Sequence, residues 1–436
     1  MRQRIVRLAL AGGVLVLALL LLLATCGGDG GGGGSDKNPK KPTKRTAGPS
    51  TRLTVPPEYT TEHGWEIIGA APEYAVSRPT GRLAFLVTAS GNRYRLRTID
   101  AASGKLAWSG TAWRPPDPLH FPKLLAVSTE DRQYFVTWAY GKVGDGLSVT
   151  DTFVSVDVYD AADGTRRRVE VPWSGAPKVT ATGPDILISD GRANSALIDP
   201  ATGQVSRTAP SALKYPKGCP SCKQLTEVRG QTAQGLLVSG QREFWVRGGW
   251  FSRNVAPKGA DRRSGVPTSV APGWILAKWQ LAKGAKRAAS HELWAVHDAK
   301  TGKPVVSVEC HKPAIEPGRY PQAVVSPSGG HLVAGNLAFD LEAAKGFCLE
   351  EEDGSTSVTL ASVTDRGVAY GAMNVRDATD ALEGGGAPVE MEFATGAVSP
   401  LSPNVRLPGM ETAGVGLFRW TDRRDRLHLI GYTRSG

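Results

Sequence analysis

The sequence has few cysteines and lacks the short motifs that commonly mark an enzyme. Five cysteines in 436 residues are too few for a small disulfide scaffold, although they allow a few specific bonds. There is no Gly-x-Ser-x-Gly nucleophile elbow, no phosphate-binding loop and no Asp-x-Asp-x-Asp-Gly calcium loop. His291 and His297 are six residues apart, not the four that place two metal ligands on one helix face. We therefore expect no catalytic residue and no metal ligand at a recognisable motif, while an active site assembled from distant loops stays open.

Positive charge is abundant, but much of it is concentrated near the N-terminus. The net charge of +11 and the 52 glycines would, taken alone, suggest a nucleic-acid binder or a flexible chain. Residues 1–25 carry +3 and residues 27–53 carry +4, which leaves only +4 for the remaining 383 residues. This is too little to argue for a nucleic-acid partner. A hydrophobic content of 41% also excludes wholesale disorder.

The first 25 residues have the features of an export signal. Three arginines precede an unbroken apolar stretch, Leu8–Ala24. The segment Leu23-Ala24-Thr25-Cys26 resembles the lipobox of bacterial lipoproteins, in which the cysteine is lipidated after cleavage, although Thr25 departs from the usual Gly, Ala or Ser. An uncleaved signal anchor is the alternative, because the 18 residues Leu8–Thr25 are just long enough to span a bilayer. Either interpretation holds the protein at the outer face of the cytoplasmic membrane.

Residues 26–63 are predicted to form a tether. The segment begins with a glycine run (27–34, interrupted by Asp29) and continues with lysines, arginines and prolines. Such a composition buries too little apolar surface to offset the entropy of ordering. The predicted domains are therefore a signal segment over 1–25, a disordered tether over 26–63 and one folded region over 64–436.

The folded region repeats two patterns of an all-β protein. The first is a strand that ends in an acidic residue, followed by a tight turn closed by glycine. It occurs at Asp100–Gly104, Asp160–Gly164, Asp199–Gly203 and Asp298–Gly302, with degenerate copies at Asp340–Gly346 and Glu392–Gly396. The second is Ala/Val-Val-Ser, a polar turn and an apolar strand, most clearly at 324–334. Together they predict four-stranded units every 40–50 residues, which is typical of a β-propeller.

The repeat count favours eight blades, with seven as the close alternative. The long gap after Gly203 hides one weak blade around Gly235–Phe251. Two final strands, near 414–420 and 427–432, have no fourth strand after them, whereas an orphan apolar run, Trp65–Ile68, precedes the first hairpin. We predict that this N-terminal strand completes the last blade and removes an exposed sheet edge.

The turn sequences resemble a known family of repeats. The segment 98–108 (Thr-Ile-Asp-Ala-Ala-Ser-Gly-Lys-Leu-Ala-Trp) is similar to the repeat of pyrroloquinoline-quinone-type propellers, and Ser326–Gly330 lies in a segment that resembles the hairpin of TolB-like and WD40-type blades. Some members of the first family are dehydrogenases with a calcium site and a pair of adjacent cysteines. No two cysteines are adjacent in this chain, so we expect no cofactor, and an oxidoreductase or envelope hydrolase remains the alternative function.

Four cysteines remain once Cys26 is set aside. Cys219 and Cys222 form a CxxC motif inside an all-β array, which favours a local disulfide over a redox site or half a zinc site. Cys310 and Cys348 lie at comparable positions of neighbouring repeats, so a disulfide between adjacent blades is predicted; two free thiols are the alternative.

Long insertions indicate where a partner would bind. Lys142–Asp151, Lys283–Ser290 and Asp377–Pro388 interrupt otherwise regular hairpins, and propeller partners usually bind one face of the ring or its channel. The sequence thus predicts a monomeric, membrane-tethered, extracytoplasmic propeller that binds an unknown protein or envelope ligand at a loop-lined face without catalysis.

Overall fold

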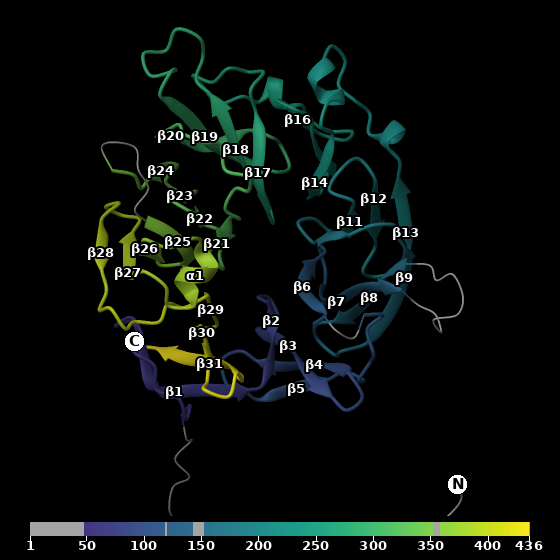
Figure 1. The fold of residues 1–436 in the computed structure, drawn as a ribbon, viewed down its shortest axis with the longest axis vertical. Coiled ribbons are helices and arrows are strands. Elements are labelled where there is room, and N and C mark those ends of the chain that lie inside the picture. Colours follow the sequence, from purple (N-terminus) through teal and green to yellow (C-terminus); the bar gives the residue numbers. More distant parts are fainter. Residues whose placement is uncertain (1–47, 118–119, 143–151, 352–357, 436) are drawn as a thin grey trace, which may run out of the picture. The chain divides into compact units, whose positions relative to one another are not determined.

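The computed structural model describes residues 48–117, 120–142, 152–351 and 358–435, and this part of the chain is almost entirely β-structure. Eight antiparallel sheets form the blades of a ring (Figure 1), so the predicted β-propeller and its blade number are both confirmed. Seven sheets have four strands and one has three. The predicted signal segment and Cys26 lie outside the described residues.

Within each blade the strands follow one another from the innermost to the outermost. Blade 1 contains β2 (Ala70–Ser77), β3 (Arg82–Ala89), β4 (Arg93–Asp100) and β5 (Leu106–Ser109). Blade 2 contains β6 (Lys123–Ser128), β7 (Gln133–Lys142), β8 (Thr152–Asp160) and β9 (Arg166–Pro172). Blade 3 contains β10 (Lys178–Thr180), β11 (Ile186–Ser189), β12 (Ser195–Ile198) and β13 (Val205–Thr208). Blade 4 contains β14 (Glu227–Thr232), β15 (Gly235–Ser239) and β16 (Phe244–Val246).

The second half of the ring follows the same plan. Blade 5 contains β17 (Val266–Ala271), β18 (Trp274–Gln280), β19 (His291–Asp298) and β20 (Pro304–His311). Blade 6 contains β21 (Val324–Val325), β22 (His331–Ala334), β23 (Leu337–Asp340) and β24 (Lys345–Cys348). Blade 7 contains β25 (Val358–Val363), β26 (Val368–Met373), β27 (Ala387–Glu392) and β28 (Val398–Pro400). Blade 8 contains β29 (Met410–Thr412), β30 (Val415–Thr421), β31 (Leu427–Arg434) and β1 (Tyr59–Ile68).

Four short helices lie in the connections of the described region. They are the 3₁₀ helices η1 (Pro210–Ala212), η2 (Pro220–Lys223) and η3 (Ser252–Asn254) and the α-helix α1 (Ala378–Leu382). In the described part of the chain, none of the helices is both long enough and apolar enough to span a membrane.

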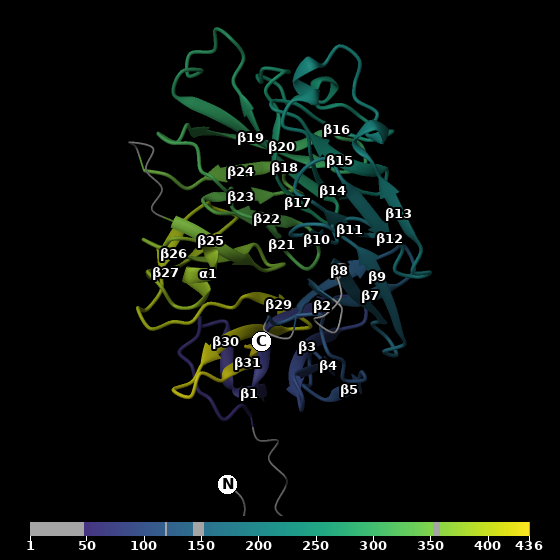
Figure 2. The same cartoon turned by 45° about the vertical axis from the view of Figure 1, so that its right-hand side comes forward.

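The ring is closed by the N-terminal strand, as the sequence predicts. Strand β1 lies beside β31 (Figure 2) and pairs with it antiparallel. Trp65 is opposite Gly431, and Ile67 is opposite Leu429. The outer edge of the C-terminal blade is therefore covered by a segment from the other end of the chain.

Blade 4 departs from the predicted four strands. Its outer position is occupied by Phe251, which makes an isolated bridge with Trp245 of β16. Gly248, in the turn between them, has a φ of 81°. A tight turn followed by η3 thus replaces a regular outer strand, which explains why this blade gives the weakest sequence signal.

The core lies between the faces of neighbouring blades. Leu86 and Leu96 of blade 1, for example, pack with Phe135 and Tyr159 of blade 2, and all four side chains are buried. Because each strand buries side chains against a neighbouring blade, the apolar runs of the sequence are distributed around the whole ring.

Each Asp-to-Gly turn connects two strands of one blade and also packs against the neighbouring blade. Trp65 of β1 packs on Gly104, the glycine of the blade 1 turn, and its Nε1–H donates to the Ala101 carbonyl over 2.8 Å. A Cβ atom on Gly104 would lie only 2.4 Å from Trp65 Cβ. The same arrangement recurs for Trp108 with Ala161 and Gly164, and for Trp250 with Ala299 and Gly302. The repeated turn therefore contributes to packing between neighbouring blades as well as to the local change of chain direction.

The aspartate of each Asp-to-Gly turn acts as expected from the sequence. Asp100 Oδ1 accepts hydrogen bonds from the Ser103 hydroxyl (2.6 Å) and the Ser103 backbone N–H (2.9 Å). These bonds lower the pKa of Asp100. The side chain thus satisfies backbone and hydroxyl donors inside the turn, which fixes its conformation.

His297 is a structural residue of blade 5. It is fully buried, its Nδ1–H donates to the Gly302 carbonyl over 2.8 Å, and its Nε2 accepts from Trp279 Nε1–H over 3.2 Å. Burial lowers the pKa of His297 to about 4, so the ring is neutral at physiological pH. Both ring nitrogens are occupied, which leaves none for a metal or a proton-transfer reaction.

Residues 48–58 pack along blades 7 and 8. The Leu53 N–H donates to the Tyr432 hydroxyl over 3.0 Å, and that hydroxyl donates to the Thr51 carbonyl over 2.7 Å. The side chains of Leu53 and Val55 pack against the cluster of buried residues around Phe418. The predicted boundary at residue 64 consequently falls inside β1, because these contacts with distant blades stabilise a segment whose own composition is poor in apolar residues.

A buried contact between Glu66 and His428 fastens this segment to the ring. Glu66 lies 2.6 Å from His428 Nδ1 and accepts hydrogen bonds from the hydroxyls of Ser50 and Thr51. Burial alone would raise the pKa of Glu66, but the hydrogen bonds from Ser50, Thr51 and His428 outweigh it and lower the pKa to about 2. Glu66 is therefore ionised at neutral pH and joins β1, β31 and the preceding segment.

Candidate functional site

Successive strands of a blade run in opposite directions, so the connections between them lie on two different faces of the ring. Connections from the first to the second strand and from the third to the fourth strand of a blade lie on one side, which we call the turn face. The other connections lie on the opposite side, which we call the loop face. Turn-face connections are all short, the longest being 199–204. The loop face carries much longer segments, including 209–226, 312–323 and 374–386.

A cavity of about 720 Å³ occupies the central channel on the loop-face side. Its walls come from the inner parts of blades 2 to 5 and from the connection 312–323. The lining side chains that carry charge or an aromatic ring are Trp138, Lys178, Glu227, Arg229, Arg319 and Tyr320. This set of residues is the candidate functional site.

Positive charge exceeds negative charge in the cavity. Glu227 lies 3.0 Å from Arg229 and 3.8 Å from Lys178, so it compensates for part of their charge. Arg319 is exposed at the mouth. Three cations and one anion give the lining a net charge of +2, which favours an acidic ligand.

Tyr320 is held rigidly at the mouth of the cavity. Its ring makes an edge contact with Trp294 at 5.7 Å between centroids, and Lys278 Nζ lies 5.1 Å from the ring centroid. The hydroxyl donates to Glu316 Oε2 over 2.5 Å. Burial, followed by this bond to Glu316, raises the pKa of Tyr320. A fixed aromatic ring beside a cationic rim is suited to contact with a partner's side chains.

A second cavity, of about 520 Å³, lies elsewhere in the channel and includes residues of the turn face. Arg78, in the first turn of blade 1, reaches across to blade 6 and donates to the carbonyls of Val325, Ser326 and Pro327, each over 3.0 Å. Burial lowers the pKa of Arg78. These bonds tie two blades that are not neighbours and narrow the channel on its turn-face side.

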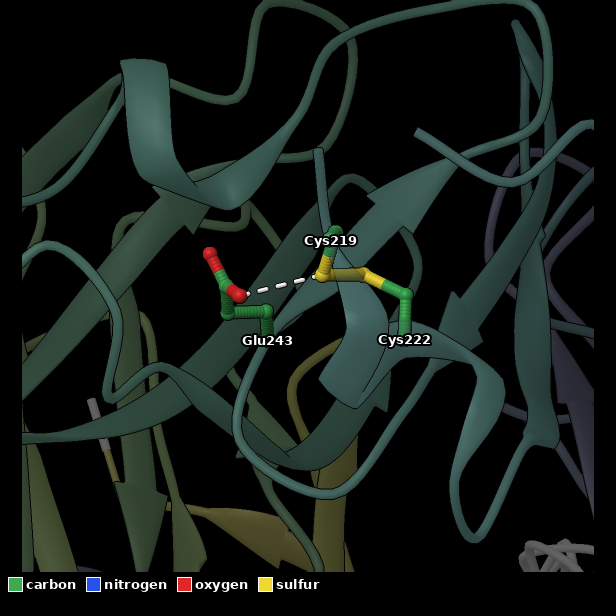
Figure 3. Close-up of side chains that lie close together, drawn as sticks. All are labelled: Cys219, Cys222 and Glu243. Carbon is green, nitrogen blue, oxygen red and sulfur yellow. Dashed lines mark hydrogen bonds between the residues drawn. A yellow bond between two sulfur atoms is a disulfide. The ribbon is translucent and has the colours of Figure 1, made fainter. Parts of the chain in front are cut away.

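The CxxC motif forms the disulfide Cys219–Cys222 on the loop face (Figure 3), with a Cα–Cα distance of 5.4 Å. It lies at η2, in the connection between blades 3 and 4. Glu243 Oε2 lies 3.0 Å from Cys219 Sγ, and the carboxylate accepts from the Ser221 hydroxyl and from Arg253. Both cysteines are buried, so a partner thiol has no access to them. This buried arrangement supports the predicted structural disulfide and not a redox site.

The second predicted disulfide is also present. Cys310, in β20, is bonded to Cys348, in β24, with a Cα–Cα distance of 5.9 Å. These are the outer strands of blades 5 and 6, as the repeat positions indicate.

Two of the long insertions named from the sequence lie in or next to loop-face connections. Lys283–Ser290 joins β18 to β19, and Asp377–Pro388 contains α1, whose N-terminus is capped by Asp377. Of Lys142–Asp151, all but Lys142 lies outside the described residues. The described residues of these insertions do not contribute to the cavity lining, which instead includes residues of the connection 312–323.

Sequence reasoning did not find the cavity residues. Lys178 and Glu227 are the first residues of inner strands, and Arg319 and Tyr320 lie just before another inner strand. Polar or aromatic residues at the loop-face start of successive inner strands are the signal that would have indicated a channel site.

These features define a β-propeller with a polar, aromatic-lined pocket at the loop-face end of its channel. No family model and no curated protein matches the sequence. Among solved structures, the chain is similar to the β-propeller domain of Cps50 (Swd1) from Myceliophteria thermophila, at 12% identity and a TM-score of 0.39, over 84% of this chain and 99% of that one. At these values the likeness carries no argument about function.

Proposed function

We propose that this protein is a non-catalytic binding module of the cell envelope, tethered to the outer face of the cytoplasmic membrane and acting as a monomer. The observation that carries the proposal is the asymmetry of the ring. One face consists of short repeated turns, whereas the other combines the long connections with the cavity of about 720 Å³. Variable loops around a rigid scaffold are the usual location of a binding site.

Exposed apolar residues also support the loop face as the binding surface. Among the residues that the structure describes, the two most exposed large hydrophobic side chains are Ile315 (85%) and Leu225 (78%). Both lie in loop-face connections, between blades 5 and 6 and between blades 3 and 4. Exposed apolar groups beside a cationic cavity are typical of a surface that a protein partner covers.

The charge of the cavity indicates the chemistry of that partner. Lys178, Arg229 and Arg319 outnumber Glu227, and Trp138 and Tyr320 provide aromatic contacts. We infer that a protein partner inserts an acidic segment into the mouth of the channel. Charge complementarity would speed its association and set its orientation.

A charge-reversal experiment tests the binding face. A photocrosslinking amino acid at Gln322, which lines the cavity, should capture a partner on intact cells. The double variant Lys178→Glu/Arg319→Glu should reduce that capture about tenfold or more, because two attractive charges become repulsive. The matched control Lys105→Glu/Lys303→Glu changes two exposed lysines of turn-face connections and should leave capture unchanged. Equal capture by both double variants would refute the loop face as the binding face.

The membrane tether has its own test. Cells that express the chain should incorporate palmitate into it, and the label should disappear in Cys26→Ala if Cys26 is lipidated. Fractionation of the same cells should show the wild-type chain in the membrane fraction. Palmitate that persists in the variant would contradict lipidation of Cys26, while membrane association without any label would indicate the signal anchor instead.

A further inference from the structure

A cluster of two histidines and a glutamate lies on the loop face, apart from the cavity. It consists of His291 at the start of β19, His311 at the end of β20 and Glu350 just after β24. One potential ligand atom from each residue lies within 4.8 Å of the others. The three side chains come from neighbouring blades 5 and 6 and belong to none of the repeat motifs.

The cluster is already organised by hydrogen bonds. His311 Nδ1 lies 2.8 Å from Glu350 Oε1, and the His311 backbone N–H donates to the same carboxylate. His291 Nδ1 lies 2.8 Å from the Ser290 hydroxyl, which leaves Nε2 as its ligating nitrogen. The two imidazole rings are close together, with centroids 3.9 Å apart. A partner that holds the non-ligating ring nitrogen of a histidine, as Ser290 does for His291, is typical of metal sites.

The adjacent disulfide fixes the positions of two of the three side chains. Cys310 immediately precedes His311, and Cys348 is two residues before Glu350. The covalent bond between β20 and β24 therefore holds His311 and Glu350 at a constant separation across the blade boundary. A site that is rigid before the ion arrives loses less entropy on binding.

We propose that His291, His311 and Glu350 bind a divalent transition-metal ion of the kind that prefers imidazole and carboxylate ligands, such as Zn²⁺. Ligand atoms around a tetrahedral zinc ion are about 3.3–3.6 Å apart, given bond lengths of about 2.0–2.2 Å. Small side-chain rotations would bring the cluster to that geometry, with the ion taking the place of the proton between His311 and Glu350. Three protein ligands leave a fourth position for water or for a group from a partner.

The location adds a functional consequence. The cluster lies beside the loop Lys283–Ser290, whose last residue, Ser290, contacts His291. An ion there would order the end of this loop and present an open coordination position on the same face as the cavity. The site differs from the cavity in residues and chemistry, so it can be tested separately.

Zinc titration of the full chain tests the proposal. The experiment uses untagged, oxidised protein in detergent, in a Cys26→Ser background that removes the unpaired thiol, with a chromophoric chelator as competitor. We expect one equivalent of Zn²⁺ to bind, little competition from Mg²⁺ or Ca²⁺, and a tetrahedral Co²⁺ spectrum. His291→Gln and Glu350→Gln should each weaken Zn²⁺ binding at least about tenfold.

An exposed pair elsewhere provides the matched control. His120 Nδ1 lies 2.7 Å from Asp117, so His120→Gln removes a histidine with a carboxylate neighbour but no second histidine. This variant should bind Zn²⁺ like the parent. Zinc should also raise the melting temperature of the parent and of His120→Gln but not of Glu350→Gln. If Glu350→Gln and His291→Gln bind zinc as tightly as the parent, or if the parent binds none, the proposal is wrong; should one of these two variants fail to fold, the other decides.

Discussion

Replacing Gly104 with alanine should cost about 2–5 kcal/mol of unfolding free energy. The glycine has a φ of 68°, which an alanine adopts at a cost of about 1–2 kcal/mol. In addition, the new Cβ would meet the Cβ and Cγ atoms of Trp65 at 2.4 Å. These atoms lie close to the backbone of β1, so relief requires the strand itself to move. The Trp65 hydrogen bond to Ala101 would then be lost together with packing at the ring closure.

Gly191→Ala is the matched control for this substitution. Gly191 has a φ of 69°, and nothing lies within 4 Å of the Cβ that alanine would add. Its variant should lose only the conformational cost, partly offset by the reduced entropy of the unfolded chain. Urea unfolding followed by tryptophan fluorescence measures both differences. Equal losses for the two variants would show that contact with Trp65 contributes nothing to stability.

Removal of the Cys310–Cys348 disulfide should destabilise the fold by about 4 kcal/mol, according to the entropy of the chain loop that it closes. The two cysteines are 38 residues apart, whereas Cys219 and Cys222 are separated by only 3. The same relation gives about 1.5 kcal/mol for the shorter loop. We therefore expect Cys310→Ala/Cys348→Ala to be clearly less stable than Cys219→Ala/Cys222→Ala.

Alanine is the suitable replacement because the cysteines of both pairs are largely buried. Denaturant midpoints of the two double variants, compared with the parent under non-reducing conditions, give the measurement. A greater loss for the Cys219 pair would contradict the loop-entropy explanation. It would point instead to the contact of Cys219 with the buried Glu243, which is itself paired with Arg253.

The blade architecture was predictable because its signals are local. An aspartate that accepts hydrogen bonds within its own turn and a glycine with positive φ are both visible in five residues of sequence, as at Asp298–Gly302. Repetition of that turn sets the number of blades. The missing outer strand of blade 4 was the exception, since Trp245 and Phe251 are joined by a single bridge that no local pattern marks.

The boundary of the folded region and the cavity depend on contacts between distant residues. Residues 48–58 are ordered by Tyr432 and other residues of blades 7 and 8. Their own polar composition had placed the start of the folded region too late, at residue 64. Similarly, Lys178, Glu227 and Arg319 lie on separate blades and connections, and only the closed ring places them around one cavity. No fixed spacing along the chain describes such a site.

Pairing of β1 with β31 also has a consequence for the order of folding. Glu66 and His428, which meet across these strands, are 362 residues apart in the chain. Blades 1 to 7 each use consecutive residues and can form as those residues become available, but blade 8 lacks its outer strand until both ends meet. Such a non-local contact forms slowly, because a very long loop must be closed. Until the two ends meet, the incomplete ring would therefore expose the edges of β1 and β31, and chaperones and proteases would have the most access to the chain during this interval.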